Sequence, residues 1–368
     1  MNKITTDMDT FIIQSTAFVF SCLMLTWIFI QCYSKISHFL GLVDKPGNRK
    51  VHEHSIPLVG GISLFSSLTL SSFLSPLVFD TIHDLMIPFF ALVLIFLMSV
   101  CDDRFDISAK LRLFIQIAAA ILVANSGVRI ESLFGMFGIF ELSINLQYLL
   151  TILILVGATN AFNLIDGIDG LAGSLGLVIT IVLAIISLHL GLNGLFLLCL
   201  GLIAGLVAFL KHNLFPAKIF MGDAGSMTLG FLLTLISIVL LQKGAESSSS
   251  KMIFILISCA LIVPVIDALR VFIKRFSRGY SILKADNSHL HHLLLNDKKN
   301  HQKVVKRIVL LQVGMFFLGV LFSEFTSVTV LLMSLFSVQI IISKVLMINK
   351  MLSEWQEQLR SNEKSALM

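Results

Sequence analysis

The chain has 368 residues, of which 56% are hydrophobic and only 13% are charged, and its mean hydropathy is +0.93. Because an ordinary soluble domain carries charge on about a quarter of its residues, this composition excludes a soluble enzyme and a disordered chain. The 23 Gly, 6 Pro and odd number of Cys, five, exclude a collagen-like chain and a disulfide scaffold. A multispanning membrane protein remains, with room for about ten or eleven helices of roughly 20 residues each.

Eleven apolar segments have the length of a membrane-crossing helix, which predicts an all-α, polytopic integral membrane protein. In chain order they cover residues 11–33, 57–79, 85–101, 108–124, 146–162, 171–190, 192–210, 227–241, 252–273, 308–323 and 326–348. We expect residues 1–348 to form one transmembrane domain and residues 349–368 to form a tail. An apolar stripe among the charges of this tail, which includes Trp355, is typical of a helix lying on the membrane surface.

The distribution of basic residues predicts the orientation of these helices. Alternating loops on one side of the membrane carry 21 of the 27 Lys and Arg residues. Those loops are 34–56, 102–112, 163–170, 211–226, 274–307 and the tail after 348. Because positively charged loops stay in the cytoplasm, we expect the N-terminus outside and the C-terminus in the cytoplasm. The net charge of +5 therefore reflects topology, and we expect no nucleic-acid partner.

Five polar clusters adjoin the apolar helices, and all five fall on the predicted cytoplasmic side. They are DKPGNRKVHEHSIPLVGG at 44–61, DDRFD at 102–106, NAFNLIDGIDG at 160–170, FMGDAGS at 220–226 and HLHH at 289–292. Ionisable groups at membrane depth are costly and mark functional sites. The external loops hold only scattered charges and the polar run AESSSS. We therefore expect the functional site at the cytoplasmic lipid boundary.

The acidic clusters suit metal binding or proton transfer. The adjacent Asp102 and Asp103 either hold a divalent cation or share a proton, so that one becomes a usable base; a solvated helix end with capping acids is the structural alternative. Asp166 and Asp169 lie among glycines, which favour a tight turn with exposed N–H groups, as an anion site requires. Asp223 precedes a span whose N-terminus would attract phosphate, or it simply caps that helix.

The histidine cluster is interpreted as phosphate-binding. His289, His291 and His292 have no accompanying Cys, and the carboxylates of the other clusters suit magnesium or manganese better than zinc. The histidines would then bind diphosphate oxygens or donate a proton to a leaving phosphate, unless they form only an interfacial patch. Acids, glycine turns and cations on one face together predict phosphoryl transfer between a water-soluble and a lipid-borne substrate.

The five clusters, in this order from about residue 41 to 295, resemble the polyprenyl-phosphate N-acetylhexosamine-1-phosphate transferase family. The likeness rests on GLVDKPGNRKVHEHSIPLVGG, DDRFDISAKLR, NAFNLIDGIDG, FMGDAGS and HLHH. It implies an enzyme of the bacterial inner membrane, facing the cytoplasm, that transfers N-acetylglucosamine 1-phosphate from UDP-N-acetylglucosamine to undecaprenyl phosphate and releases UMP. The resemblance also implies a need for Mg²⁺, which Mn²⁺ could replace, and a product used for a surface polysaccharide such as O-antigen lipopolysaccharide or enterobacterial common antigen.

The same resemblance assigns functional residues. Catalytic roles fall on Asp102, Asp103, Asp166, Asp169 and His289, with one of the adjacent pair deprotonating the lipid phosphate. Substrate-binding roles fall on Arg49, Lys50, His54, Lys110, Asn163, Phe220, His291 and His292, with the Phe near the uracil. Metal-binding roles fall on Asp223 and Asp102.

Three alternatives stay open. Ala285 stands where relatives acting on N-acetylglucosamine often have Pro, so the donor could be another UDP-N-acetylhexosamine. A secondary transporter would place polar groups near mid-bilayer, where Pro264, Asp267 and Arg270 form the only comparable cluster, and we interpret its two charges as a helix ion pair. A catalytically silent scaffold is the third alternative. A homodimer, and the choice between a one-step and a two-step mechanism, are left open.

Overall fold

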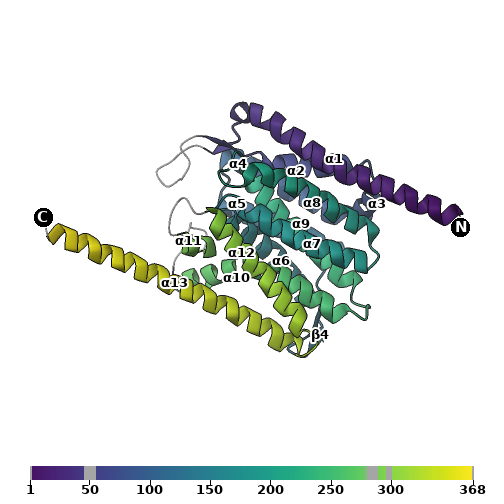
Figure 1. Ribbon diagram of the computed structural model, residues 1–368. Helices are drawn as coiled ribbons and strands as arrows, with labels where there is room; N and C mark the ends of the chain where they lie inside the picture. Colours follow the sequence, from purple (N-terminus) through teal and green to yellow (C-terminus); the bar gives the residue numbers. More distant parts are fainter. Residues whose placement is uncertain (1, 45–54, 278, 280–288, 296–300, 367–368) are drawn as a thin grey trace.

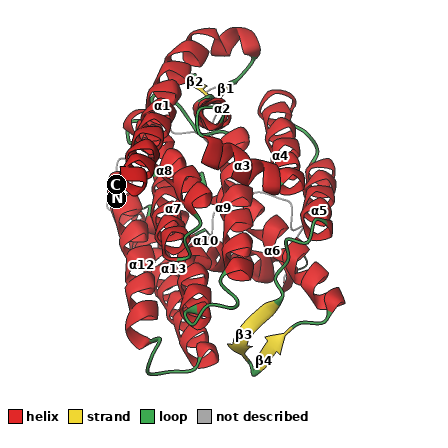
Figure 2. Cartoon of the chain, turned by 90° about the vertical axis from the view of Figure 1, so that its right-hand side faces the viewer, coloured by secondary structure: helices red, strands yellow, loops and turns green. Residues whose placement is uncertain are grey.

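The computed structural model describes the chain except residues 1, 45–54, 278, 280–288, 296–300 and 367–368. The described chain is almost entirely helical, with two short hairpins (Figures 1 and 2). The helices are α1 (Asn2–Leu40), α2 (Gly60–Ser72), α3 (Pro76–Asp84), α4 (Met86–Phe105), α5 (Ala109–Asn125), α6 (Ile144–Ile165), α7 (Leu171–His189), α8 (Asn193–Asn213), α9 (Asp223–Lys243), α10 (Ser250–Ser277), α11 (Leu290–Leu294), α12 (His301–Phe322) and α13 (Val328–Ala366). The predicted all-α membrane architecture is confirmed.

Each of the eleven predicted apolar segments lies in a helix or in the α2–α3 pair. In the described part of the chain, nine helices are long and apolar enough to cross a membrane, and α2 with α3 raises the number to as many as ten. The remaining predicted span, 108–124, coincides with α5, which has 17 residues. The total of eleven spans and their orientation stay predictions.

The segment predicted as one span at 57–79 is two helices. α2 and α3 meet at an angle of 104°. Ser75 is extended, with φ −123° and ψ 106°, and Pro76 is the first residue of α3. A proline disfavours helical geometry in the residue before it, yet fits the first position of a new helix. The bend therefore follows from the Ser-Pro step.

Helix α9 lies at the centre of the bundle (Figure 2). It contacts α2, α4, α6, α7 and α10, and every residue from Ala224 to Leu241 is buried. A helix that is apolar on all sides is expected to be buried on all sides. Its first residue, Asp223, is consequently fixed by the surrounding helices.

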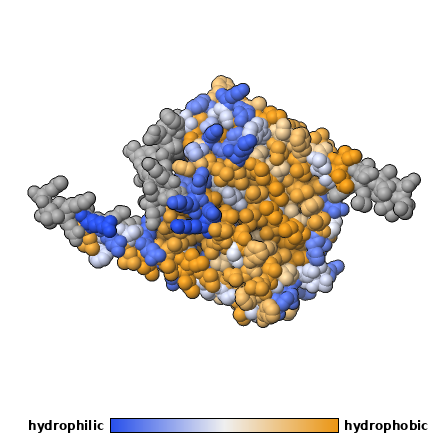
Figure 3. All heavy atoms as spheres, viewed as in Figure 1, coloured by the Kyte–Doolittle hydropathy of each residue, from blue (hydrophilic) through white to orange (hydrophobic). Residues whose placement is uncertain are grey.

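The two ends of the bundle differ in structure. Between α5 and α6, strands β3 (Ser132–Met136) and β4 (Ile139–Glu141) form an antiparallel hairpin at one end. At the other end, β1 (Val43–Asp44) pairs with β2 (Ile56–Pro57). Hydrophobic residues cover the middle of the face shown in Figure 3, and hydrophilic residues gather toward its two ends. This distribution fits a protein embedded in a bilayer.

The C-terminal segment continues the last predicted span as one helix. α13 has 39 residues, and its helical turns pass residue 349 without a break. Met351, Leu352, Trp355 and Leu359 are exposed along it. That this part lies on the inner leaflet, and that the chain divides at 348, stay predictions.

Candidate active site

The polar clusters meet at one end of the bundle, where α4 and α6 end and α9 begins (Figure 1). Side-chain hydrogen bonds there join α4 to α5, α4 to α9 and α6 to α9. The short helix α11 packs nearby against α12 and α13. The chain therefore concentrates its ionisable groups at one edge of the apolar region.

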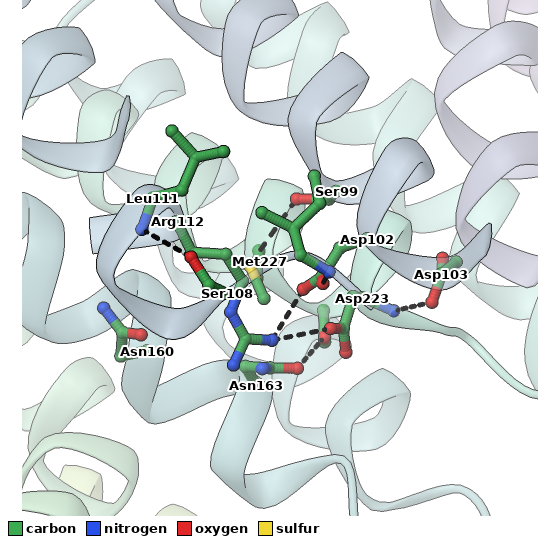
Figure 4. Close-up of polar contacts among 12 residues, drawn as sticks. Ser99, Asp102, Asp103, Ser108, Leu111, Arg112, Asn160, Asn163, Asp223 and Met227 are labelled. Carbon is green, nitrogen blue, oxygen red and sulfur yellow. Dashed lines mark hydrogen bonds and ion pairs between the residues drawn. The ribbon is translucent and has the colours of Figure 1, made fainter. Parts of the chain in front are cut away.

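Asp102 joins the end of α4 to α5. Its side chain is 2% exposed, and its Oδ1 accepts a hydrogen bond from the backbone N–H of Ile107 at 2.8 Å. Its Oδ2 lies 2.6 Å from Nη1 of Arg112, and the same nitrogen lies 3.2 Å from Oδ2 of Asp223 on α9 (Figure 4). One guanidinium group thus contacts two carboxylates, and both oxygens of Asp102 are bound within the chain.

Asp103 caps the start of α9. Its two carboxylate oxygens accept hydrogen bonds from the backbone N–H groups of Asp223 and Ala224, at 2.8 and 2.9 Å. Such N–H groups in a first turn have no partner within their own helix, and this end of a helix attracts negative charge. Gly222 has φ +71° and comes so close that an added Cβ would lie 2.7 Å from Asp103 Oδ2. The side chain of Asp103 therefore caps the N-terminus of a helix other than its own.

The FMGD segment is fixed by the first turn of α2. The N–H of Gly60 donates to the carbonyl of Phe220 at 3.0 Å, and the N–H of Gly61 donates to that of Met221 at 2.9 Å. Gly61 and Gly225 touch backbone to backbone, which leaves no space for a Cβ on Gly61. These contacts hold the entry into α9 and so the position of its first residue. Stacking of Phe220 on the uracil stays a prediction.

The turn between α6 and α7 carries two more carboxylates. Burial, together with the negative charges of Asp103 and Asp169, raises the pKa of Asp166 to about 7. Asp169 accepts a hydrogen bond from the N–H of Ala217 at 3.0 Å and lies 3.7 Å from Nδ1 of His301. Asp166 can therefore gain or lose a proton near neutral pH, as a general acid or base must.

The histidine motif starts α11. His289 and His291 are buried, and their rings stack with centroids 5.9 Å apart. The ring of His292, which is half-buried, lies 4.1 Å from that of His291. Burial first, and then the neighbouring histidines, lower the pKa of His291 to about 3. His291 is therefore neutral at physiological pH.

The chain is similar to a known protein family and to named bacterial proteins. The pattern of glycosyl transferase family 4 matches residues 85–241. A Bacillus subtilis (strain 168) protein named probable undecaprenyl-phosphate N-acetylglucosaminyl 1-phosphate transferase is 31% identical over 297 residues, which cover 80% of this chain and 81% of the relative. The undecaprenyl-phosphate alpha-N-acetylglucosaminyl 1-phosphate transferases of Salmonella typhi and Escherichia coli (strain K12) are 31% and 30% identical, each over 75% of both chains. The chain belongs to glycosyl transferase family 4.

Membership in glycosyl transferase family 4 confirms the predicted family, and the chain is a multi-pass membrane transferase. The matched region holds DDRFD, NAFNLIDGIDG and FMGDAGS, whose residues meet around the start of α9. Asn163, for example, accepts a hydrogen bond from Ser226 Oγ at 2.8 Å. The roles of the individual residues stay predictions.

The predicted basic substrate-binding residues fall into two groups. Arg49, Lys50 and His54 lie outside the described residues. Lys110 is exposed in the first turn of α5. Arg112, half a turn further along that helix, is the basic residue that contacts the carboxylates (Figure 4).

Three residues that contact the predicted site residues were not predicted from the sequence. Arg112 belongs to the quoted motif DDRFDISAKLR, so its presence there was the available signal. Asp267 was interpreted as half of a helix ion pair, although it also binds the histidine motif. His301 lies beside Asp169 and packs on the ring of Phe215, with centroids 5.0 Å apart, and no motif marks it.

The carboxylates fit a hard divalent cation by their chemistry, since Mg²⁺ prefers oxygen ligands. Among the described residues, no three His, Cys, Asp or Glu side chains converge closely enough to hold a metal by themselves. Mg²⁺ commonly uses one or two carboxylates together with substrate phosphates, so such a cage is not required. Of the two predicted ligands, Asp102 has both oxygens bound within the chain, whereas the ion pair of Asp223 with Arg112 uses one oxygen. Asp223 is the better placed ligand.

Proposed function

We propose that this family 4 transferase moves N-acetylglucosamine 1-phosphate from UDP-N-acetylglucosamine to undecaprenyl phosphate. The observation that carries the proposal is the cluster of Asp103, Asp166, Asp223 and Arg112 at one edge of the apolar bundle. Relatives with 30 and 31% identity bear names that state this reaction. A site at the membrane edge suits one lipid-borne and one water-soluble substrate.

The chemistry is a displacement at phosphorus. An oxygen of the lipid phosphate attacks the β-phosphorus of the UDP-sugar, the bond from that phosphorus to the bridging oxygen breaks, and UMP leaves with the bridging oxygen. A carboxylate of the site accepts the proton of the lipid phosphate, and Arg112 and the histidines stabilise phosphate charge. Mg²⁺, or Mn²⁺ in its place, held by Asp223, would neutralise negative charge on the diphosphate. A two-step route through an aspartyl intermediate would serve the same overall reaction.

The setting of the reaction follows the same proposal. The protein lies in a bacterial inner membrane. Its active site faces the cytoplasm, because the basic loops gather at the end of the bundle that holds the site. The product would start a cell-surface polysaccharide such as O-antigen lipopolysaccharide or enterobacterial common antigen. UDP-N-acetylglucosamine, undecaprenyl phosphate and membrane lipid are the proposed partners, and the proposal holds for a monomer or a homodimer.

The test uses membranes that contain the protein, undecaprenyl phosphate, Mg²⁺ and UDP-N-acetylglucosamine labelled in the sugar and in the β-phosphate. Transfer of both labels to lipid with release of UMP is expected, and Asp103→Asn and Asp223→Asn should abolish it. Product from UDP-N-acetylgalactosamine alone would correct the sugar. Absence of product from every UDP-sugar, or full activity of both variants, would contradict the proposal.

A further inference from the structure

Asp267 on α10 is a buried carboxylate with three donors around it. The residue is 2% exposed. Its Oδ1 accepts hydrogen bonds from Nη2 of Arg270 at 2.8 Å and from the backbone N–H of Leu290 at 3.0 Å. Its Oδ2 lies 3.0 Å from Nδ1 of His289. A simple helix ion pair would join Asp267 to Arg270 alone, whereas this carboxylate also binds Leu290 and His289.

The contacts of Asp267 connect α10 with the histidine motif, 22 residues further along the chain. Leu290 is the first residue of α11 and His289 is its N-cap, so the carboxylate supplies the acceptor that the first turn needs. A carboxylate accepts hydrogen bonds and cannot donate them when ionised. The proton at the contact therefore belongs to Nδ1 of His289, and Nε2 is the ring nitrogen left to a ligand.

The same anchoring determines where the histidine motif lies. The rings of His289 and His291 are nearly parallel, at 4°. His291 in turn packs on the turn between α6 and α7, because an added Cβ on Gly167 would lie 2.6 Å from its Nε2. That turn begins with Asp166. Asp267 thus holds two histidines against the segment that carries a titrating carboxylate.

We propose that Asp267 is a positioning residue for the transferase reaction. It fixes the imidazole of His289 in the tautomer with the proton on Nδ1, so that Nε2 meets the phosphates of the substrates. The inference rests on the proposed function, in which His289 acts on those phosphates. A carboxylate that orients an imidazole is a known device in hydrolases and metal sites, where its loss costs a factor of ten or more.

The decisive variant is Asp267→Asn, which keeps the shape but offers an amide N–H toward Nδ1. We expect kcat to fall on the order of 10- to 100-fold, with the KM for UDP-N-acetylglucosamine changed less than threefold. Because Asp267 acts through His289, His289→Asn and the double variant should be equally slow, within about twofold. Gln339→Leu is the matched control, since buried Gln339 of α13 donates to the carbonyl of Val263 on α10 at 3.1 Å, while its Oε1 has no hydrogen-bond partner. This control should lower thermal stability and leave kcat unchanged.

A second readout does not depend on activity. In protein labelled with ¹⁵N-histidine, the signal lost in His289→Asn identifies His289 among the ten histidines. We expect protonated Nδ1 in the wild type and protonated Nε2 in Asp267→Asn. Protonated Nε2 in the wild type, or additive losses of kcat in the double variant, would overturn the inference. If the wild type makes no lipid product, the proposed function fails, while the tautomer still decides the role of Asp267.

Discussion

The side chain of Asp103 holds the backbone of Asp223. The N–H of Asp223 donates to Asp103 Oδ1 at 2.8 Å, across a sequence separation of 120 residues. One of the two acids predicted as the base and one of the two predicted metal ligands therefore share one hydrogen bond at the junction of α4 and α9. Because α9 is buried from Ala224 to Leu241, it cannot shift to accommodate a change at this junction. Substitutions that displace Asp103 should thus disturb both functions together.

Gly222→Ala should displace Asp103. Gly222 has φ +71° and ψ 171°, a conformation almost restricted to Gly, in which a residue with a Cβ is strained by about 1 to 3 kcal/mol. An added Cβ would also lie 2.7 Å from Asp103 Oδ2, so the capping hydrogen bonds must lengthen. We expect at least a tenfold loss of product formation and a lower melting temperature, measured by thermal unfolding in detergent.

The control for this change is Gly138→Ala in the β3–β4 hairpin. Gly138 has a similar φ of +75°, and nothing lies within 4 Å of the added Cβ. Its loss of stability should reflect the backbone strain alone, and its activity should be that of the wild type. Equal activity of the two Ala variants would show that the Asp103 cap tolerates displacement.

Arg112→Gln should destabilise the fold and reduce activity. Asp102 would remain buried without a cationic partner, at a cost between the value for exposed ion pairs, about 1 kcal/mol or less, and that for buried ones, about 3 to 5 kcal/mol. An intermediate loss is expected because Arg112 is 29% exposed. Chemical denaturation of the purified protein would measure it.

The double variant Asp102→Asn with Arg112→Gln separates stability from function. Removing the buried charge with its partner should restore most of the stability lost in Arg112→Gln. Product formation should stay low, because Asp223 has still lost its guanidinium neighbour. Recovery of activity together with stability would mean that Arg112 is needed only for folding.

The sequence predicts the parts of this structure that local pattern determines. Apolar runs mark the helices. The Ser-Pro sequence at 75–76 marks the α2–α3 bend if the proline is interpreted as the start of a new helix. Motifs such as DDRFD and FMGDAGS mark the elements that carry carboxylates. Their pairing depends on contacts across long sequence separations, which no local pattern encodes. The ion pair between Arg112 and Asp223 joins residues 111 positions apart in the sequence. Asp267, which the sequence pairs only with Arg270 of the same helix, also binds His289 of the histidine motif.

The pH dependence of the reaction should follow Asp166. Its pKa is raised to about 7, so the carboxylate is protonated below that pH and ionised above it. If Asp166 acts as an ionised group, kcat/KM should rise as the pH increases from 6 to 8. Asp169→Asn removes one neighbouring negative charge and makes ionisation easier. The rise should then shift to lower pH in a profile measured from pH 5.5 to 9.

Asp106→Asn is the matched control for this shift. Asp106 is exposed at the end of α4 with φ 50°, a conformation that Asn adopts readily. Its charge does not contribute to the raised pKa of Asp166. The pH profile of this variant should match that of the wild type. A shift as large as that of Asp169→Asn would indicate a general effect of net charge.

The two predicted metal ligands should behave differently toward Mg²⁺. Ligand binding to the folded state stabilises it in proportion to the logarithm of the ligand concentration above Kd, so Mg²⁺ should raise the melting temperature of the wild type. Asp223→Asn, which should also be inactive, should abolish this rise. Asp102→Asn should retain the rise, because both oxygens of Asp102 are already bound by Ile107 and Arg112. It should instead melt at a lower temperature without metal, since Arg112 loses its closest carboxylate.

Mn²⁺ should produce the same pattern. Loss of the Mg²⁺ response in Asp102→Asn with its retention in Asp223→Asn would reverse the assignment.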